Sequence, residues 1–312
     1  MNIISASRRT DIPHYYARWF RERRKAGFAE YRTVFGGGRN GRFSVSLKPE
    51  DVLAYLFWTK YAGPFQEELA ELRAAGVPYA FQYTLTGYGP GYEPDIPAAE
   101  DTIRDFLSTA AHLPAADCIQ WRYDPIVLSS ACPPDWHRRN FERIADALCG
   151  STRVVNVSFV EPYLKAISKA PAGESIRWRR PDPGRHKAVF KKYPHLPSAG
   201  AEAELLLQDL SDLARSRGME LRICCNEEWS GRFPGASCCG LDLFLPFGKE
   251  MSGSVSRLAA GPSRTGCGCR KVVDIGMDTT CPGGCFYCYV TTTREQARMN
   301  YHRHDPAAAW LR

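Results

Sequence analysis

Three cysteines near the C-terminal end of the sequence have the spacing of ligands to a single metal cluster. The segment reads Cys281-Pro-Gly-Gly-Cys285-Phe-Tyr-Cys288, a CxxxCxxC motif with an aromatic residue just before the last cysteine. Three thiolates at this spacing can wrap a short loop around one [4Fe–4S] cube and bind three of its four irons. Gly283 and Gly284 allow the loop the positive φ angles that such a turn needs. The fourth iron would then have no protein ligand.

This arrangement resembles the cluster loop of radical S-adenosylmethionine enzymes. The resemblance implies that the open iron binds S-adenosylmethionine, that an electron from the cluster cleaves its sulfonium group, and that a carbon radical results. It also implies that Tyr287 lies beside the adenine of the cofactor. A structural zinc site is the alternative, because zinc takes four ligands and Cys285 with Cys288 would form one pair. The other pair would be Cys267 with Cys269, or Cys224 with Cys225.

The cysteines of the whole chain, including these three, are concentrated in one part of it. Nine of the twelve lie between residues 224 and 288, about a fifth of the sequence. In a reducing compartment such clustering is more typical of metal ligands than of disulfides. A second centre, either a [4Fe–4S] cluster or zinc, is therefore predicted, and Cys224 or Cys239 would be able to replace a neighbouring ligand. Its expected ligands are Cys225, Cys238, Cys267 and Cys269.

The composition is that of an ordinary globular protein and limits the classes of partner. Hydrophobic residues make up 44% and charged residues 24% of the 312 positions, which excludes a disordered chain. No apolar run approaches the ~18 residues of a membrane span, so no membrane partner is expected. The first residues, MNIISASRRTDIP, lack the apolar stretch of an export signal, and we expect a cytoplasmic protein. The net charge of +7 is compatible with an anionic substrate or a nucleic acid.

Short strand patterns alternate with helical patterns along most of the sequence. The expected strands are 3–7, 43–47, 54–59, 79–86, 118–123, 154–160 and 221–225, and the expected helices are 14–26, 65–75, 98–112, 135–148, 201–217 and 292–300. This alternation predicts a parallel sheet with helices outside. A further strand at 271–276 would close the sheet beside residues 3–7. The expected fold is therefore an α/β, TIM-like (β/α) barrel with a Cys-rich C-terminal metal-binding segment.

The chain is expected to form one integrated domain. Residues 1–225 would make the barrel body, and residues 226–312 the Cys-rich cap, the closing strand and the cluster loop. Residues 171–198 have the character of an insertion or a long loop. Residues 226–270 are rich in Gly, Ser and Cys with little periodicity, which predicts a segment organised by metal rather than by an apolar core.

Polar residues follow several of the expected strands, where the chemistry of a (β/α) barrel takes place. The catalytic candidates are Arg9, Asp11, Lys60, Arg122 and Asp124. Arg8 and Arg122 are candidates for holding a carboxylate of the cofactor or the substrate, since guanidinium binds carboxylates bidentately. Internal ion pairing, Arg122 with Asp124 or Arg9 with Asp11, is the alternative. Alternating polar residues at 82, 84, 86, 156 and 158 predict a polar lumen.

Motifs spread along nearly the whole chain resemble the domain-of-unknown-function 1848 family of prokaryotic proteins, which are often described as radical-SAM-like. The matching segments are IISASRRTDIP (3–13), FWTK (57–60), FQYTLTGYG (81–89), WRYDPI (121–126), SFV (158–160), CNEE (225–228), the Cys238 region, CGC (267–269), DIG (274–276) and CPGGCFYCY (281–289). The resemblance implies the C-terminal cluster motif and the four further cysteines, but no particular reaction.

These observations together predict an iron–sulfur enzyme that cleaves S-adenosylmethionine reductively. Its partners would be a reductant such as flavodoxin or ferredoxin and an unidentified substrate. Two alternatives stay open. One is a zinc-stabilised barrel that binds nucleic acid through residues 177–192, where seven basic residues are interleaved with Trp178 and Phe190. The other is an electron-transfer protein whose clusters are fully ligated.

Overall fold

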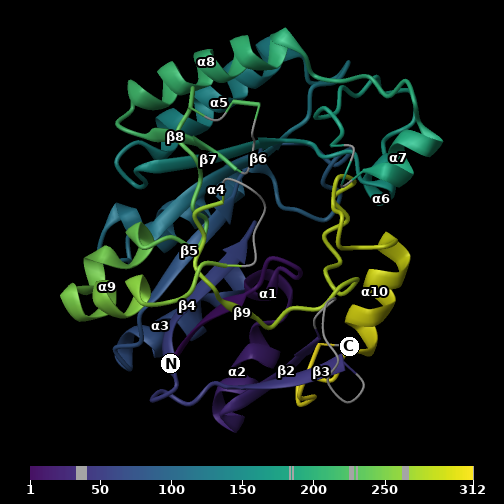
Figure 1. Ribbon diagram of the computed structural model, residues 1–312. Helices are drawn as coiled ribbons and strands as arrows, with labels where there is room; N and C mark the ends of the chain where they lie inside the picture. The colour runs from purple at the N-terminus through teal and green to yellow at the C-terminus, as the bar shows by residue number, and fades with distance from the viewer. Residues whose placement is uncertain are drawn as a thin grey trace.

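Seven parallel strands form the central sheet of the protein (Figure 1). The computed structural model describes residues 1–32, 41–182, 184, 186–224, 228–229, 231–261 and 267–311. The strands of the sheet are β1 (Asn2–Ala6), β4 (Val52–Thr59), β5 (Tyr79–Thr84), β6 (Ile119–Ile126), β7 (Val154–Phe159), β8 (Glu220–Ile223) and β9 (Val273–Asp274). Their order across the sheet is β8-β7-β6-β5-β4-β1-β9.

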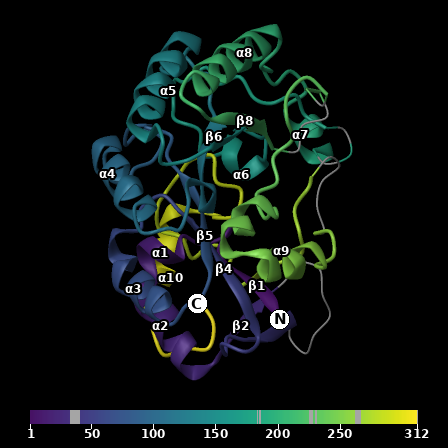
Figure 2. The same cartoon turned by 90° about the vertical axis from the view of Figure 1, so that its left-hand side faces the viewer.

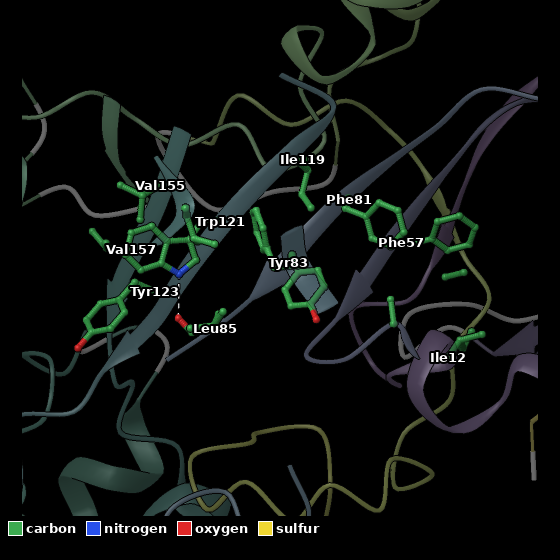
Figure 3. Packing of buried hydrophobic residues seen from close by; sticks show 14 of the residues in the cluster. Ile12, Phe57, Phe81, Tyr83, Leu85, Ile119, Trp121, Tyr123, Val155 and Val157 are labelled. Carbon is green, nitrogen blue, oxygen red and sulfur yellow. Dashed lines mark hydrogen bonds between the residues drawn. The ribbon is translucent and has the colours of Figure 1, made fainter. Parts of the chain in front are cut away.

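Large aromatic side chains on one face of the sheet form the main core (Figure 3). Phe57, Phe81, Tyr83 and Trp121 are fully buried there, and the Trp121 indole nitrogen donates to the carbonyl of Leu85 at 2.8 Å. Helices cover this face: α2 (Ala17–Ala26), α3 (Gln66–Ala74), α4 (Ala99–Ala110), α5 (Pro134–Leu148) and α8 (Ala201–Arg215). Because side chains alternate along a strand, the intervening residues point to the opposite face.

That opposite face is covered in part by the Cys-rich segment. Within it, η4 (Asp242–Phe247) and α9 (Lys249–Ser256) place Leu243, Phe244 and Val255 against Ile3 and Leu56 in a second apolar cluster. Figure 2 shows α9 on the side of the sheet away from α3 and α4. The prediction that residues 226–270 are organised by metal rather than by a core is therefore wrong for this part. A few apolar residues in two short helical turns produce no visible periodicity, yet they suffice to cover the sheet.

The closing strand lies where the sequence predicted it. β9 pairs in parallel with β1, with Ile4 opposite Val273 and Ser5 opposite Asp274. The strand order is that of a barrel. In the part of the chain that the structure describes, however, no ladder joins β8 to β9, so these two strands are the edges of a parallel α/β sheet.

Several expected elements differ in detail. The strand expected at 43–47 is β3 (Arg42–Ser46), which pairs antiparallel with β2 (Phe28–Arg32) in a separate ribbon. Its side chains are exposed or half-buried except Val45, so it does not have the two buried faces of a parallel strand. The helix expected from residue 14 is split into α1 (Ile12–Tyr15) and α2. The remaining elements are η2 (Gly63–Phe65), η3 (Ala116–Cys118), α6 (Leu164–Ile167), α7 (Lys187–Lys192) and α10 (Arg294–Arg303). Among the described residues, the helices are too short or too polar to cross a membrane.

Asp274 fixes the closing strand to the residues around the end of β1. Its carboxylate accepts hydrogen bonds from the hydroxyls of Ser5 (2.9 Å) and Ser7 (2.6 Å), from the backbone N–H of Arg8 (2.9 Å) and from Nε of Arg9 (3.2 Å). Burial alone would raise the pKa of Asp274, but Arg9, Ser7 and Arg8 together hold the pKa of this carboxyl below its ordinary value.

Replacing Asp274 by Asn tests this anchor. The substitution leaves the mostly buried Arg9 without its closest counter-charge, and we expect the free energy of unfolding to fall by about 3 kcal/mol in urea denaturation at pH 7. Because folding lowers the pKa of Asp274, the carboxylate stabilises the fold above about pH 4, and this stabilisation is lost as the pH falls through the lowered value. The difference between the two proteins should therefore shrink below about pH 4.

The matched control is Asp278→Asn. Asp278 is 48% exposed and touches Arg9 only at 3.5 Å, so its loss should cost less than about 1 kcal/mol. Equal effects of the two substitutions at pH 7 would show that the buried position of Asp274 is not what stabilises the strand.

Candidate metal centres

Six residues separate β9 from the CxxxCxxC loop, which is held against the segment that follows β1. The hydroxyl of Tyr16 donates to the carbonyl of Thr280 at 2.7 Å, and the hydroxyls of Thr10 and Thr280 lie 2.7 Å apart. Thr10 also donates to the carbonyl of Met277 at 2.9 Å. These contacts place the loop at the carboxyl edge of the parallel sheet, where functional sites of such sheets occur.

The three cysteines of the loop are half-buried thiols whose charged forms influence one another. Burial raises the pKa of Cys281 to about 12 and also raises the pKa of Cys285. Neighbouring charge adds to the effect, since Cys288 raises the pKa of Cys281, and both Cys281 and Cys288 raise that of Cys285. A bound metal would remove this penalty, because metals bind thiolates and displace their protons. Three thiols that can become thiolates are the donor chemistry that a [4Fe–4S] cluster needs, although in the described residues Cys281, Cys285 and Cys288 do not form a preformed group of three ligands.

The two glycines of the loop differ in geometry, and the positive φ predicted for Gly283 is wrong, because only Gly284 of the two has a positive φ. Gly284 has φ of +70°, and a Cβ at this position would lie 2.8 Å from Cγ of Pro94 and 3.0 Å from Nε of Arg294. At Gly283 a Cβ would lie 3.2 Å from Cδ1 of Ile96. The backbone therefore passes so close to the segment after β5 that larger residues do not fit without a shift.

Glu93 is the centre of a buried polar network beside the loop. It is 3% exposed, and its Oε1 accepts hydrogen bonds from Nζ of Lys60 (2.9 Å), from the hydroxyl of Thr86 (2.7 Å) and from the hydroxyl of Tyr287. Burial would lower the pKa of Lys60, but Glu93 and Cys285 raise it, so the amine stays charged. The predicted residues Lys60 and Tyr287 thus meet next to Cys285.

A second lysine holds the other end of the loop. Nζ of Lys169 donates to the carbonyls of Cys288 (2.6 Å) and Thr291 (3.1 Å), and Nζ of Lys165 donates to the carbonyl of Val290 (3.4 Å). Burial lowers the pKa of Lys169, and Cys288 counteracts that effect. The loop thus has one lysine near Cys285 and another at Cys288.

A second group of cysteines is centred on Cys238. The buried thiol of Cys238 makes hydrogen-bonding contacts with Cys224 and Cys269, and these contacts lower the pKa of Cys238. Cys269 also contacts Cys239, and its hydrogen bonds to Cys238 and Cys239 raise the pKa of Cys269. Nη1 of Arg122 donates to Sγ of Cys238 at 3.0 Å.

The predicted second ligand set is therefore brought together in part. Cys238 and Cys269 are in contact, and Cys224 and Cys239 join them, while Cys225 lies outside the described residues. Cys267 is half-buried in the chain segment whose Gly268 carbonyl accepts a hydrogen bond from Ser237 at 2.8 Å. The cysteines that the structure describes are free thiols. In the same residues, no three His, Cys, Asp or Glu side chains are arranged to hold a metal ion.

The charged candidates at the strand ends are ion-paired, though not all as expected. Arg122 pairs with Asp124, as in the alternative of internal ion pairing, and its guanidinium lies 5.1 Å from the ring centroid of Trp58. The other pair of that alternative, Arg9 with Asp11, does not form. Arg9 pairs with Asp274 instead, because the closing strand brings this carboxylate next to β1.

Asp11 has a structural role. Its carboxylate accepts hydrogen bonds from the Thr59 hydroxyl (2.7 Å), from the backbone N–H of Lys60 (2.8 Å) and from that of His14 (3.1 Å). The last contact caps α1. Both oxygens are thus engaged in joining α1 to the end of β4, and burial raises the pKa of Asp11.

The inner face of the sheet is polar on β5, β6 and β7, as the alternating residues predicted, whereas Ile3 of β1 and Leu56 of β4 lie in the second apolar cluster. Nε2 of Gln82 donates to Oε1 of Gln120 at 2.7 Å, and Nδ2 of Asn156 donates to the same oxygen at 2.8 Å. Gln120 in turn donates to Asp242 of the covering segment at 3.1 Å. This layer lies beside Arg122 and the second cysteine group.

Comparison with known proteins agrees with the sequence motifs. Residues 3–290 match the family model described as "Domain of unknown function (DUF1848)". The chain belongs to this family. A mannonate dehydratase from Streptococcus suis serotype 2 is similar in structure at 15% identity and a TM-score of 0.32, over 62% of the DUF1848 chain and 59% of the dehydratase chain. No curated protein matches the sequence.

Three residues of the site in this DUF1848 protein were not among the candidates from the sequence. Glu93 lies in a loop of mixed composition, and nothing in its neighbourhood signals a buried carboxylate. Asp274 belongs to the DIG motif, which was a usable signal because a charged residue interrupts a short apolar strand. Trp58 lies on a strand that is almost entirely apolar, so its position on the polar face was hidden.

The fit of the loop backbone is open to direct test. The Gly284→Ala variant requires a strained positive φ and a shift of Pro94 or Arg294, and we expect the free energy of unfolding to fall by about 1–3 kcal/mol in urea denaturation. Gly89→Ala is the matched control, because a Cβ there meets nothing within 4 Å. If both variants are equally stable, the loop does not need glycine at position 284.

Proposed function

We propose that this DUF1848 protein is a radical S-adenosylmethionine enzyme whose cluster is held by Cys281, Cys285 and Cys288. The observation that carries the proposal is the placement of these cysteines together in one glycine-containing loop at the carboxyl edge of a parallel sheet. A [4Fe–4S] cluster on these ligands would supply the electron for reductive cleavage of the S-adenosylmethionine sulfonium. Such a cluster needs a reducing compartment, so the proposal includes a cytoplasmic location and a small reductant such as flavodoxin or ferredoxin.

Two lysines near the loop support a site that compensates the negative charge of cysteine thiolates. Lys60 lies near Cys285, and Lys169 lies near Cys288. Glu93 holds both Lys60 and the hydroxyl of Tyr287, which fixes the tyrosine ring beside the loop. In this arrangement Tyr287 is positioned to border the bound cofactor.

The polar inner face of the sheet offers a place for the substrate. Arg122, Asp124 and Gln82 lie there next to the second cysteine group. We propose that this second group, with Cys238 and Cys269 at its centre, holds a further iron–sulfur cluster or zinc. The other two ligands would be Cys225 and Cys267, as predicted from the sequence. Cys224 or Cys239 would be able to replace a neighbouring ligand.

Anaerobic purification tests the proposal. We expect a brown protein with about eight irons per chain if both centres are clusters, or about four irons and one zinc if only the loop holds a cluster. After reduction, S-adenosylmethionine should change the EPR spectrum of the loop cluster, because it binds at the open iron. Zinc without iron would overturn the proposal, and iron without any response to S-adenosylmethionine would favour an electron-transfer protein.

Cysteine variants separate the two centres. We expect Cys285→Ala to abolish the EPR response to S-adenosylmethionine while the metal of the second centre remains. Cys238→Ala should have the opposite effect, with loss of the second metal and retention of the response. Cys149→Ala is the control, because Cys149 is exposed and distant from both groups in the sequence. Loss of both centres in the well-folded Cys285→Ala variant would contradict this division.

The nucleic-acid alternative has less support. Within residues 177–192, Arg177 pairs with Glu202 and Arg179 pairs with Glu161, so two of the basic side chains already have counter-charges. Trp178 is buried at 3% exposure and does not offer its ring for base stacking.

A further inference from the structure

Nearly every cation at the carboxyl edge of β1, β4 and β6 has a carboxylate within close contact. Arg9 pairs with Asp274 at 3.2 Å, Lys60 pairs with Glu93 at 2.9 Å, and Arg122 pairs with Asp124. Arg8 is the exception among these four. Its side chain is 46% exposed, and the nearest carboxylate oxygen among the described residues, on Asp274, is 3.9 Å from Nε, beyond hydrogen-bonding distance.

Asp274 has little capacity left for the Arg8 guanidinium. Its Oδ2 accepts from the hydroxyl of Ser5 and from the backbone N–H of Arg8, and its Oδ1 accepts from Ser7 and from Nε of Arg9. The five N–H donors of the Arg8 guanidinium are therefore available to a ligand, in a planar arrangement that suits a carboxylate or a phosphate.

A second unsatisfied donor lies beside Arg8. The guanidinium carbon of Arg8 is 5.9 Å from the ring centroid of Trp58, and that of Arg122 is 5.1 Å from the same ring. The indole nitrogen of Trp58 is buried and has no hydrogen-bond acceptor among the residues that the structure describes. A buried N–H without an acceptor is unfavourable, and an oxygen of a bound ligand would relieve it.

Tyr289 extends this group toward the cluster loop. It follows Cys288 directly, is 49% exposed and packs against Tyr163 with ring centroids 5.0 Å apart. Its hydroxyl is among the groups that raise the pKa of Arg8, together with Cys239, Asp274 and Cys269, whereas burial lowers it. Arg8 therefore lies between the loop and the second cysteine group.

We infer that Arg8, with the indole N–H of Trp58, binds an oxyanion of a ligand placed between the two cysteine groups. The oxyanion is a carboxylate or a phosphate. It belongs either to the substrate or to the methionine part of S-adenosylmethionine, and only the second source rests on the proposed function. Such a ligand would give the exposed Arg8 guanidinium a hydrogen-bonded counter-charge and would give the buried N–H of Trp58 an acceptor.

The test is anaerobic titration calorimetry with three probes: inorganic phosphate, S-adenosylmethionine and decarboxylated S-adenosylmethionine. Arg8→Gln should weaken binding of phosphate or of S-adenosylmethionine by about tenfold to a hundredfold, the usual loss for a charged hydrogen bond. Trp58→Phe keeps the ring and removes the N–H, so it should weaken the same probe by a smaller factor. Arg18→Gln, at an exposed position on α2, is the control and should bind as the unmodified protein does.

The three probes identify the source of the oxyanion. If Arg8→Gln weakens S-adenosylmethionine but not its decarboxylated form, the ligand group is the carboxylate of the cofactor. If it weakens phosphate and leaves S-adenosylmethionine unchanged, the group belongs to the substrate. The inference is overturned if the unmodified protein binds neither phosphate nor S-adenosylmethionine, or if Arg8→Gln and Trp58→Phe bind both with unchanged affinity. Phosphate binding through Arg8 in a protein without iron would overturn the proposed function and leave this inference standing.

Discussion

The parallel pairing of β9 with β1 is the constraint on which the rest of the site depends. It joins residues about 270 positions apart in the sequence, with Ser5 opposite Asp274, and the mostly buried Asp274 carboxylate fixes the pair through Ser5, Ser7 and Arg9. Parallel strands present their carboxyl ends at the same edge of a sheet. The loop after β9 is therefore placed beside the ends of β1 and β4, where Lys60 and Glu93 meet Cys285.

The alternation of side chains along the strands then gives the sheet one face that packs into the apolar core and an inner face that borders the cysteine groups. Phe57, Phe81 and Trp121 build the apolar core, so their neighbours on the same strands line the inner face. On β4 this face carries Trp58 near the second cysteine group and, two residues later, Lys60 near the loop. Two residues of a strand span roughly 6.6 Å. Both cysteine groups thus border the same polar region, which is where the proposal places the substrate.

The sequence predicted those parts of the site that follow from local pattern. The CxxxCxxC loop and the contact of Arg122 with Asp124 each depend on residues a few positions apart. The strand beside β1 is a distant pairing that was expected from the closing position in a barrel. Other pairings between distant segments were not predictable. Arg9 meets Asp274 rather than Asp11 because two strands at opposite ends of the chain pair, and η4 with α9 covers the sheet through scattered apolar residues. Closure into a barrel was expected from the number of strands, but strand number does not determine whether the two edges meet.

Electrostatics gives a reason why cations gather at the sulfur atoms. Thiolates bound to a metal cluster carry net negative charge into a half-buried site, and burial of unbalanced charge is costly. The chain places Arg122 against Cys238, Lys60 near Cys285 and Lys169 against the carbonyl of Cys288. Two of these cations, Arg122 and Lys60, are in turn held by carboxylates, which limits the positive charge when the thiols are protonated. The same residues can therefore stabilise the folded chain with neutral thiols, and they would compensate the charge of the clusters that we propose.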